Sequence, residues 1–188
     1  AYTDRVKILV LGGTRFVGRH LTEHLLRSGD EPTLFHRSPT DLFPECEHLY
    51  GDRDGGLAPL EGRTWDAVID VSGYLPRLVR DAVRTVRTER YVFVSTISVY
   101  ADGTDAPHET SPVVPPVDDT EVVKTATYAG LKVACEREVL NGETPWAIVR
   151  PTVVVGPHDP SDRLGFWVRR RRRGNPYPVP ARLDQPVQ

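Results

Sequence analysis

The chain has 188 residues, of which 39% are hydrophobic and 27% are charged, the ordinary balance of a globular domain with a hydrophobic core. The formal net charge of −2 excludes a whole-molecule attraction to nucleic acid or to an anionic membrane, and no apolar run is long enough to span a bilayer. The two cysteines, Cys46 and Cys135, exclude a disulfide framework and favour a reducing, cytoplasmic location.

The N-terminal part of the chain predicts a strand, a glycine-rich turn, a helix and two further strands. Residues 6–11 are a continuous apolar run, typical of a strand that is buried on both faces. After the glycines, apolar residues recur at helical spacing as far as a stop at Ser28-Gly29. Residues 33–36 and 47–52 then have the character of short strands.

The rest of the chain continues this alternation. A fourth strand is expected at 66–73, a helix from Pro76 to Val86, and a fifth strand, rich in β-branched and aromatic residues, at 91–96. After a proline-rich loop, a helix at 127–140 and a sixth strand at 146–151 are expected. The pattern predicts an α/β fold, a doubly wound parallel sheet (Rossmann fold) with helices on both faces.

The glycine-rich turn has the form of a dinucleotide-binding loop. Gly12 and Gly18 keep the outer spacing of G-x-x-G-x-x-G, but Arg15 occupies the middle position. Because the loop lies between an apolar strand and an amphipathic helix, the first N–H groups of that helix would point at a pyrophosphate. The loop residues expected to contact the cofactor are Gly12, Thr14, Arg15, Phe16, Val17 and Gly18.

The end of the second strand bears on which dinucleotide is bound. An NAD site has a carboxylate there, about 20 residues after the glycines, but this chain has His36 and Arg37. A guanidinium matches a 2′-phosphate, and Arg15 could fold over the same phosphate or over the pyrophosphate. We therefore expect NADP to be preferred over NAD. The alternative left open is that Arg15 points to solvent and Arg37 is a loop charge.

A catalytic pattern lies further along the chain. Tyr128 and Lys132 are four residues apart on the predicted helix, so both lie on one face. A nearby ammonium lowers the pKa of a phenol, ordinarily about 10, toward the range useful for proton transfer. Such a spacing alone is common on helices, but the hydroxyls of Ser95, Thr96 and Ser98 follow the fifth strand, at the edge where such sheets bind ligands.

The segments GGTRFVG, GDRD, DAVIDVSGY, FVSTISVYAD, YAGLK and RPTVVVGP occur in this order over nearly the whole chain. Together they resemble the extended short-chain dehydrogenases/reductases of the NAD(P)-dependent epimerase/dehydratase superfamily. The loop GGTRF resembles an atypical branch that includes chloroplast RNA-binding relatives. The resemblance implies a reductase, epimerase or dehydratase for a hydroxyl or carbonyl substrate, with nucleotide-sugars among the candidates. It leaves open an atypical member that binds NADP as a sensor or RNA-associated protein without turnover.

The resemblance also implies individual roles. Tyr128 would be the general acid/base, Lys132 its partner and a ligand of the nicotinamide ribose, and Thr96 the substrate-facing hydroxyl. Asp52 would approach the adenine. The residues implied to line the nicotinamide half of the cofactor are Val71, Ser72, Gly73, Pro151 and Thr152. No metal ligand is assigned. The expected partner is a small-molecule substrate, with a homodimer as a further expectation and no membrane or nucleic-acid partner favoured.

The C-terminal part of the chain follows the sixth expected strand and contains a run of arginines. The resemblance implies an NAD(P)-binding Rossmann domain at 1–155 and the beginning of a substrate-binding region at 156–188, so we expect the natural protein to be longer. Five arginines, at 169–173, stand on a helix expected to end at Gly174. We favour a solvated helix end, where cations suit the helix dipole. The alternative is a phosphate site for a nucleotide-sugar or an RNA backbone.

Overall fold

The computed structural model of the chain describes residues 5–101 and 106–174. The chain divides into two compact units, Ala1–Pro151 and Thr152–Gln188. The described part of the second unit contains one helix, α4 (Arg163–Arg172). No helix among the described residues is long and apolar enough to cross a membrane.

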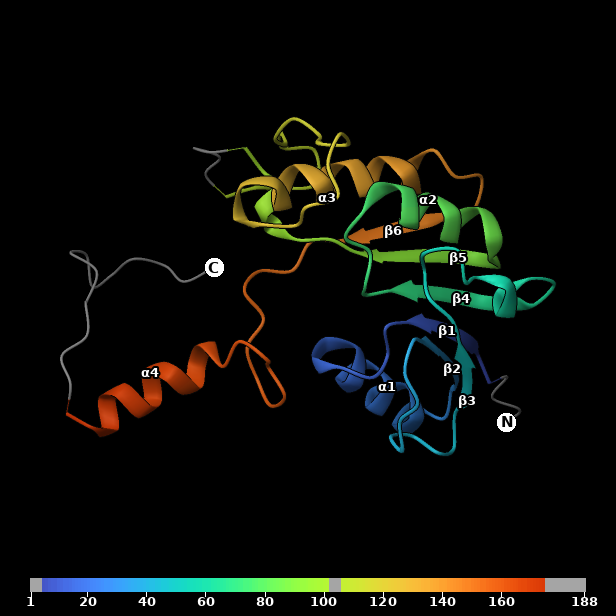
Figure 1. Cartoon of the computed structure of the whole chain (residues 1–188), viewed down its shortest axis with the longest axis horizontal. Coiled ribbons are helices and arrows are strands. Elements are labelled where there is room, and N and C mark those ends of the chain that lie inside the picture. The colour runs from blue at the N-terminus through green and yellow to red at the C-terminus, as the bar shows by residue number, and fades with distance from the viewer. Residues whose placement is uncertain (1–4, 102–105, 175–188) are drawn as a thin grey trace. The chain divides into compact units, whose positions relative to one another are not determined.

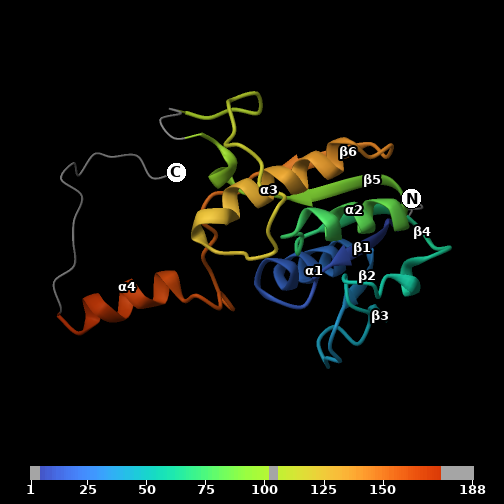
Figure 2. The same ribbon diagram turned by 45° about the horizontal axis from the view of Figure 1, so that its top comes forward.

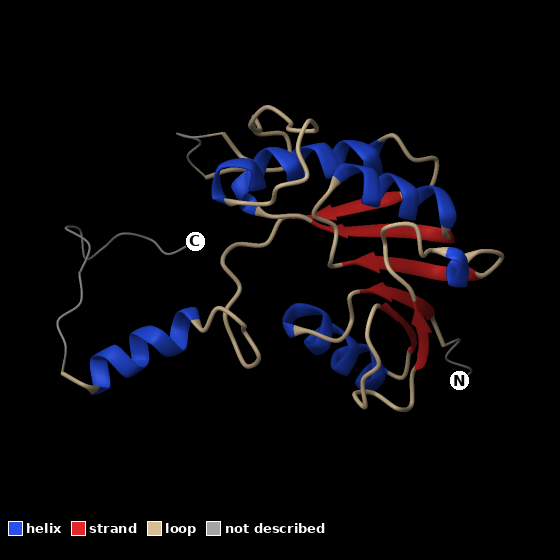
Figure 3. Cartoon of the chain, viewed as in Figure 1, coloured by secondary structure: helices blue, strands red, loops and turns tan. Residues whose placement is uncertain are grey.

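Within the described residues, the first unit contains one sheet of six parallel strands (Figure 3). Their order across the sheet is β3-β2-β1-β4-β5-β6. This order, with β1 and β4 side by side at the centre, confirms the predicted doubly wound sheet. The strands are β1 (Lys7–Leu11), β2 (Glu31–His36), β3 (Glu47–Tyr50), β4 (Thr64–Asp70), β5 (Arg87–Val94) and β6 (Trp146–Val149).

Three helices of the first unit cover the two faces of the sheet. Helix α1 (Phe16–Ser28) connects β1 to β2 and lies on one face, whereas α2 (Pro76–Thr85) and α3 (Thr125–Leu140) lie on the other (Figures 1 and 2). Short 3₁₀ turns follow β3 and β5, at Ala58–Leu60 and Ile97–Val99. The predicted helices are therefore present, each within a few residues of its expected bounds.

The core follows the two-residue alternation of the strands. In β1, Leu9 and Leu11 pack with residues of α2 and α3, whereas Ile8 and Val10 pack with Leu25 of α1. All four strand side chains are buried, so β1 is apolar on both faces, as its continuous hydrophobic run predicts. Each such side chain contributes roughly 1.5–3 kcal/mol through its burial.

Strand β5 begins earlier than its hydrophobicity indicates. It starts at Arg87, four residues before Tyr91, and its first part pairs with β4 through Thr64 and Arg87. The side chains of this first part are polar and mostly exposed. Backbone pairing alone therefore extends the strand beyond the core, which a hydrophobic pattern does not indicate.

Candidate cofactor and active site

The glycine-rich turn lies where β1 and β4 end beside each other. Gly12 has a φ of +94°, and a Cβ atom there would lie 2.8 Å from the Cβ of Ser72. Ser72 follows β4, and its Oγ donates a hydrogen bond to the carbonyl of Leu11 at 3.1 Å. Glycine is thus required at position 12 both by the backbone conformation and by the close approach of the β4 loop.

Helix α1 begins directly against this turn. A Cβ at Gly18 would lie 2.0 Å from the carbonyl oxygen of Gly12, so no larger residue fits. The buried hydroxyl of Thr22 lies 2.9 Å from the carbonyl oxygens of both Gly13 and Gly18. The contact between Thr22 and Gly13 holds the first turn of α1 close to the end of β1, as a pyrophosphate site requires.

Arg15 is the N-cap residue of α1 and has an extended backbone, with φ −128° and ψ 141°. Any L-residue adopts this conformation, which explains why the loop accepts an arginine in place of the usual middle glycine. No side chain caps the helix and its first turn has no acidic residue, so its N–H groups are left for an anion. Arg15 itself is exposed, and the neighbouring loop residues Thr14, Phe16 and Val17 are half-buried.

The two residues at the end of β2 differ in their surroundings. His36 is buried, and its ring hydrogen-bonds the Ser38 carbonyl and the ring of His48. Arg37 is exposed and lies 3.6 Å from the carboxylate of Asp52, which follows β3. The structure thus places Arg37 and Asp52 together, both beside the end of β2. An exposed pair of this kind is weak, so a ligand phosphate could displace the carboxylate.

A buried ionic network, absent from the predicted site, supports the loop after β4. Asp70 is fully buried and receives hydrogen bonds from Arg53 at 2.5 and 2.8 Å and from the Tyr91 hydroxyl at 2.9 Å. It also accepts from the backbone N–H of Ser72 at 3.0 Å. Burial alone would raise the pKa of Asp70, but the charge and hydrogen bonds of Arg53 hold it below its ordinary value. The network fixes the predicted cofactor-lining segment.

The same segment is attached to β1 and to α3. Val71 donates its N–H to the carbonyl of Leu11 at 3.2 Å. The carbonyl of Gly73 accepts from the Lys132 ammonium at 2.7 Å. The predicted residues Val71, Ser72 and Gly73 therefore form one loop between the glycine-rich turn and the predicted catalytic lysine.

Lys132 is buried, with 3% of its surface exposed. Its ammonium donates to the carbonyls of Gly73 and Val94, at 2.7 and 2.8 Å, and lies 4.1 Å from the centre of the Phe93 ring. Burial lowers the pKa of Lys132 to about 8, although nearby acidic groups act to raise it. Two of its three N–H groups are engaged by the described residues, which leaves one for a ligand.

Tyr128 lies in the first turn of α3 and is half-buried. Its ring centre is 6.5 Å from that of Tyr74, and the Tyr74 ring centre is 5.6 Å from the Lys132 ammonium. Tyr128 and Lys132 thus share one face of α3, next to the loop that follows β4. Tyr128 is not fully buried, as proton exchange with a substrate requires.

The hydroxyl of Thr96 lies just after β5 and is nearly buried. It accepts a hydrogen bond from the N–H of Ser98 at 3.2 Å. Ile97 donates its N–H to the carbonyl of Pro151 at 3.0 Å, so the end of β6 lies beside this turn. Thr152, the next residue, is exposed and begins the second unit, and its role at the nicotinamide end stays a prediction.

A second ion pair, also not predicted, joins α3 to the end of β6. The guanidinium of Arg150 binds the buried carboxylate of Glu136 at 2.7 and 3.0 Å, and it lies 4.9 Å from the Tyr100 ring. Glu136 is one turn after Lys132 on the helix. This contact holds α3 against the sheet.

In the second unit, the arginine run forms the last turn of α4 and continues to the cap at Arg173. Phe166 and Trp167 are in edge-to-face contact, with ring centres 5.1 Å apart, and about half of each residue is exposed. Arg169 pairs with Asp162 at the start of the helix. The prediction of a helix that ends near Gly174 is confirmed, since Gly174 has a φ of +71°.

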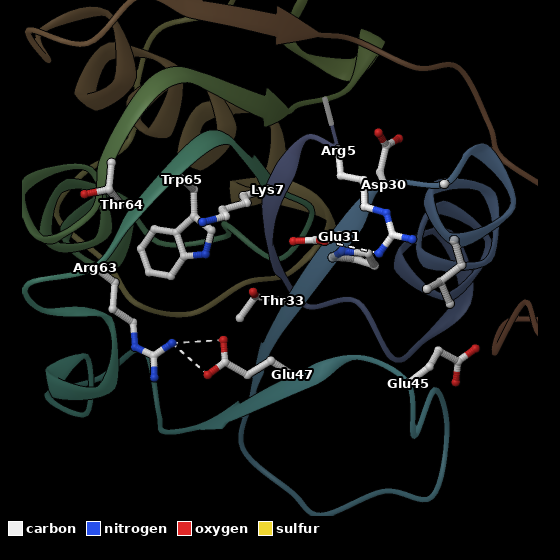
Figure 4. Close-up of a pocket in the computed structure, with 13 residues that line it drawn as sticks. Arg5, Lys7, Asp30, Glu31, Thr33, Glu45, Glu47, Arg63, Thr64 and Trp65 are labelled. Carbon is white, nitrogen blue, oxygen red and sulfur yellow. Dashed lines mark hydrogen bonds and ion pairs between the residues drawn. The ribbon is translucent and has the colours of Figure 1, made fainter. Parts of the chain in front are cut away.

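The opposite, amino edge of the sheet contains a hollow of about 690 Å³ (Figure 4). It is lined by charged side chains that pair with one another, Arg5 with Glu31 and Arg63 with Glu47. Two of its three cations are thus paired with carboxylates, and ligands of open parallel sheets bind at the carboxyl edge. We therefore assign the functional site to the carboxyl edge. Among the described residues, no three His, Cys, Asp or Glu side chains could hold a metal ion together.

The residues at the carboxyl edge fit a dinucleotide. A Cβ at Gly12 would fill the turn that the pyrophosphate approaches, and the first turn of α1 has neither a side-chain cap nor an acid. At the nicotinamide end, the lysine ammonium has one uncommitted N–H among its described contacts. These features suit a phosphate at one end and a ribose at the other.

Comparison with known proteins agrees with this assignment. The chain is 27% identical to the chloroplast stem-loop binding protein of 41 kDa b of Arabidopsis thaliana, over 93% of the chain and 49% of that protein. UDP-glucuronic acid 4-epimerase from Bacillus cereus in complex with NAD has a similar fold, with a TM-score of 0.68, 20% identity and coverage of 90% of this chain and 64% of the epimerase. Human epimerase family protein SDR39U1 with NADPH gives a TM-score of 0.67 at 21% identity, over 93% and 62% of the two chains.

The chain thus spans about half of the chloroplast relative and less than two thirds of these solved chains. Its fold is shared with proteins that bind NAD and with one that binds NADPH. The model of the NAD dependent epimerase/dehydratase family matches residues 63–185, more than half of the sequence. The chain belongs to the NAD dependent epimerase/dehydratase family.

Proposed function

We propose that the protein is an NADP-preferring oxidoreductase or epimerase of the extended short-chain type that acts on a hydroxyl or carbonyl substrate, with nucleotide-sugars as the first class to test. The observation that carries this proposal is the position of Lys132. Its ammonium is buried between the carboxyl ends of β4 and β5, on the helical face that also contains the half-buried Tyr128.

The cofactor would be held along the carboxyl edge. The uncapped N-terminus of α1 binds the pyrophosphate, and Arg15 and Arg37 approach the 2′-phosphate. The loop at 71–73 and Pro151 line the nicotinamide end, where Lys132 holds the ribose. Arg15 in the glycine-rich turn and Arg37 directly after β2, where an NAD site would have a carboxylate, support NADP over NAD.

The side chains of this chain would handle the proton. The cofactor, when bound, supplies or accepts a hydride at the substrate carbon. Tyr128 takes the proton from the substrate hydroxyl on oxidation and returns it on reduction. Lys132, protonated below about pH 8, favours the phenolate form of Tyr128 by its charge. Thr96 orients the substrate oxygen from the end of β5.

The test has two stages. A thermal-shift screen of NADP, NAD and nucleotide-sugars identifies ligands, because a ligand that binds only the folded state raises the melting temperature. With a substrate in hand, Tyr128→Phe should lower kcat by at least about a hundredfold, as expected for loss of a general acid/base, with NADP affinity nearly unchanged. Tyr74→Phe is the matched control, since it removes a neighbouring phenol. Unchanged turnover in Tyr128→Phe would refute the mechanism.

A second candidate function is that of an RNA-associated protein that binds NADP without turnover. Similarity to a chloroplast stem-loop binding protein and the exposed Phe166 and Trp167 next to the arginine run of α4 favour it. Exposed aromatic rings stack on unpaired bases, and arginines bind phosphates. Replacing the arginines at 169–173 by glutamine should then abolish salt-dependent binding of a stem-loop RNA. No RNA binding by the unaltered protein would remove this candidate.

A further inference from the structure

His36, the last residue of β2, and His48, the second residue of β3, form a chain of hydrogen bonds that ends at a backbone carbonyl on each side. The Nδ1 atom of His36 lies 2.7 Å from the carbonyl oxygen of Ser38, and its Nε2 atom lies 2.8 Å from Nδ1 of His48. The Nε2 atom of His48 lies 2.9 Å from the carbonyl oxygen of Phe43. The two rings are nearly perpendicular, with centres 5.1 Å apart.

A count of protons gives the charge of this pair. A carbonyl oxygen only accepts, so each of the two outer nitrogens must carry a proton to bond Ser38 and Phe43. The inner contact, between His36 and His48, needs a third proton between the two rings. Two neutral imidazoles carry only two protons. All three contacts are therefore satisfied only when the pair holds three protons and one positive charge.

The described part of the protein does not neutralise this charge. No described carboxylate lies within ion-pair distance of either imidazole, and Tyr50 contacts both rings through its own ring. The thiol of Cys46, with its pKa raised to about 11 by burial, is neutral. The charged groups of β2 and β3 themselves, Glu31 and Glu47, pair with Arg5 and Arg63. The other charged or titratable groups on the surrounding elements are Arg37 and Asp52, which pair with each other, Arg19, His20 and Glu23, which pair on α1, and Arg15, His24, Arg27, Asp41 and Glu45.

From this geometry we infer that His36 and His48 share one proton and act together as a cation that selects for the 2′-phosphate of NADP. The inference rests on the proposed NADP site and adds His48 to its specificity-determining residues. Arg37 already has a carboxylate partner, whereas the pair has none among the described residues. A buried charge without a counter-ion favours an anionic ligand, and the adenosine ribose of such folds lies at the end of β2.

Binding is then linked to pH. Burial is the main cause that lowers the pKa of His36, because a charged ring without a counter-ion is poorly solvated. The hydrogen bond to the Ser38 carbonyl raises this pKa, and the charge of His48 lowers it. A phosphate dianion nearby would raise the pKa of the pair. The complex would thus hold more protons than the free protein, so NADP affinity falls as the pH rises and the histidine pair loses its shared proton.

The experiment measures the Kd of NADP and of NAD from pH 6 to 8 with the 188-residue chain. For the unaltered protein we expect the Kd of NADP to rise about tenfold over this range, while that of NAD changes less than about twofold. His48→Gln should weaken NADP binding at pH 6 and flatten its pH dependence. His24→Gln, which removes an exposed histidine of α1, should behave as the unaltered protein. The second pKa of the phosphate, near 6, affects all three proteins alike.

Nitrogen-15 NMR of the histidine rings tests the pair without any ligand. At pH 6 we expect both outer nitrogens to be protonated and the two inner nitrogens to share one proton. A ring with an unprotonated outer nitrogen at pH 6, or an unchanged pH profile in His48→Gln, would overturn the inference. If NADP is not preferred at any pH but the NMR shows the shared proton, the proposed cofactor preference fails and the cation remains. If NADP is preferred without any pH dependence, the pair is not the selector.

Discussion

Arg5 and Arg63, at the amino edge of the sheet, each lie against a carboxylate of a neighbouring strand, whereas Lys132 and the histidine pair, at the carboxyl edge, hydrogen-bond only neutral groups. Both edges are built from the same strands and both are polar. The difference is that these arginines of the amino edge are neutralised by carboxylates, whereas these cations of the carboxyl edge are left for a ligand. Paired charges at the end of a strand thus stabilise the fold, and unpaired ones indicate a binding site.

The comparison also explains why the hollow at the amino edge is not the functional site. Its volume of about 690 Å³ would accommodate a cofactor-sized molecule, but two of its three cations, Arg5 and Arg63, already pair with carboxylates (Figure 4). At the carboxyl edge the helix N-terminus is uncapped and the hydroxyl of Ser95 is buried without a partner among the described residues. Unsatisfied polar groups, rather than volume, distinguish the two edges.

The largest effect is expected from breaking the buried ion pair between Arg53 and Asp70 at the carboxyl edge. Arg53→Met leaves the buried carboxylate of Asp70 without its cation and should lower the free energy of unfolding by about 3–5 kcal/mol. Arg63→Met, at the amino edge, breaks an exposed pair and should cost no more than about 1 kcal/mol. Urea denaturation of both variants measures the difference. Equal losses would show that burial does not separate the two edges.

A smaller effect should appear as a dependence of stability on pH. Lys132 in the folded protein has its pKa lowered to about 8, whereas an unfolded lysine titrates near 10.4. Between these values the unfolded chain binds the extra proton, so the free energy of unfolding should rise with pH, by at most about 1.4 kcal/mol per unit. Lys132→Met should lose this slope between pH 8 and 10. Lys7→Met, at the amino edge, should keep it, and a slope shared by both variants would argue against a buried ammonium.

Much of this arrangement follows from local sequence. The apolar run of β1 predicts a strand that is buried on both faces, because only such a strand needs hydrophobic side chains at every position. The four-residue spacing of Tyr128 and Lys132 places them on one helical face whatever the rest of the fold does. The extended conformation of Arg15 at the helix cap likewise agrees with an ordinary strand-to-helix turn.

The contacts that sequence reasoning missed depend on strand register. His36 meets His48 because Leu34 pairs with His48 across β2 and β3, which places the two rings diagonally on one face. Arg53 and Asp70 come together from segments 17 residues apart. An acid at the end of an apolar strand, with an arginine after the GD of GDRD, was the available signal. A periodic pattern locates elements but not the pairing between them.

The smallest expected effect is the coupling across the amino edge itself. A double-mutant cycle of Arg63→Met and Glu47→Gln should give a coupling energy of at most about 1 kcal/mol, because both side chains are about half exposed. The coupling should shrink further in 1 M salt, where the screening length falls to about 3 Å. Both single variants should leave NADP affinity unchanged, since Arg63 and Glu47 lie at the amino edge and neutralise each other. A loss of NADP affinity in either variant would place a ligand in the amino-edge hollow and reverse the assignment of the two edges.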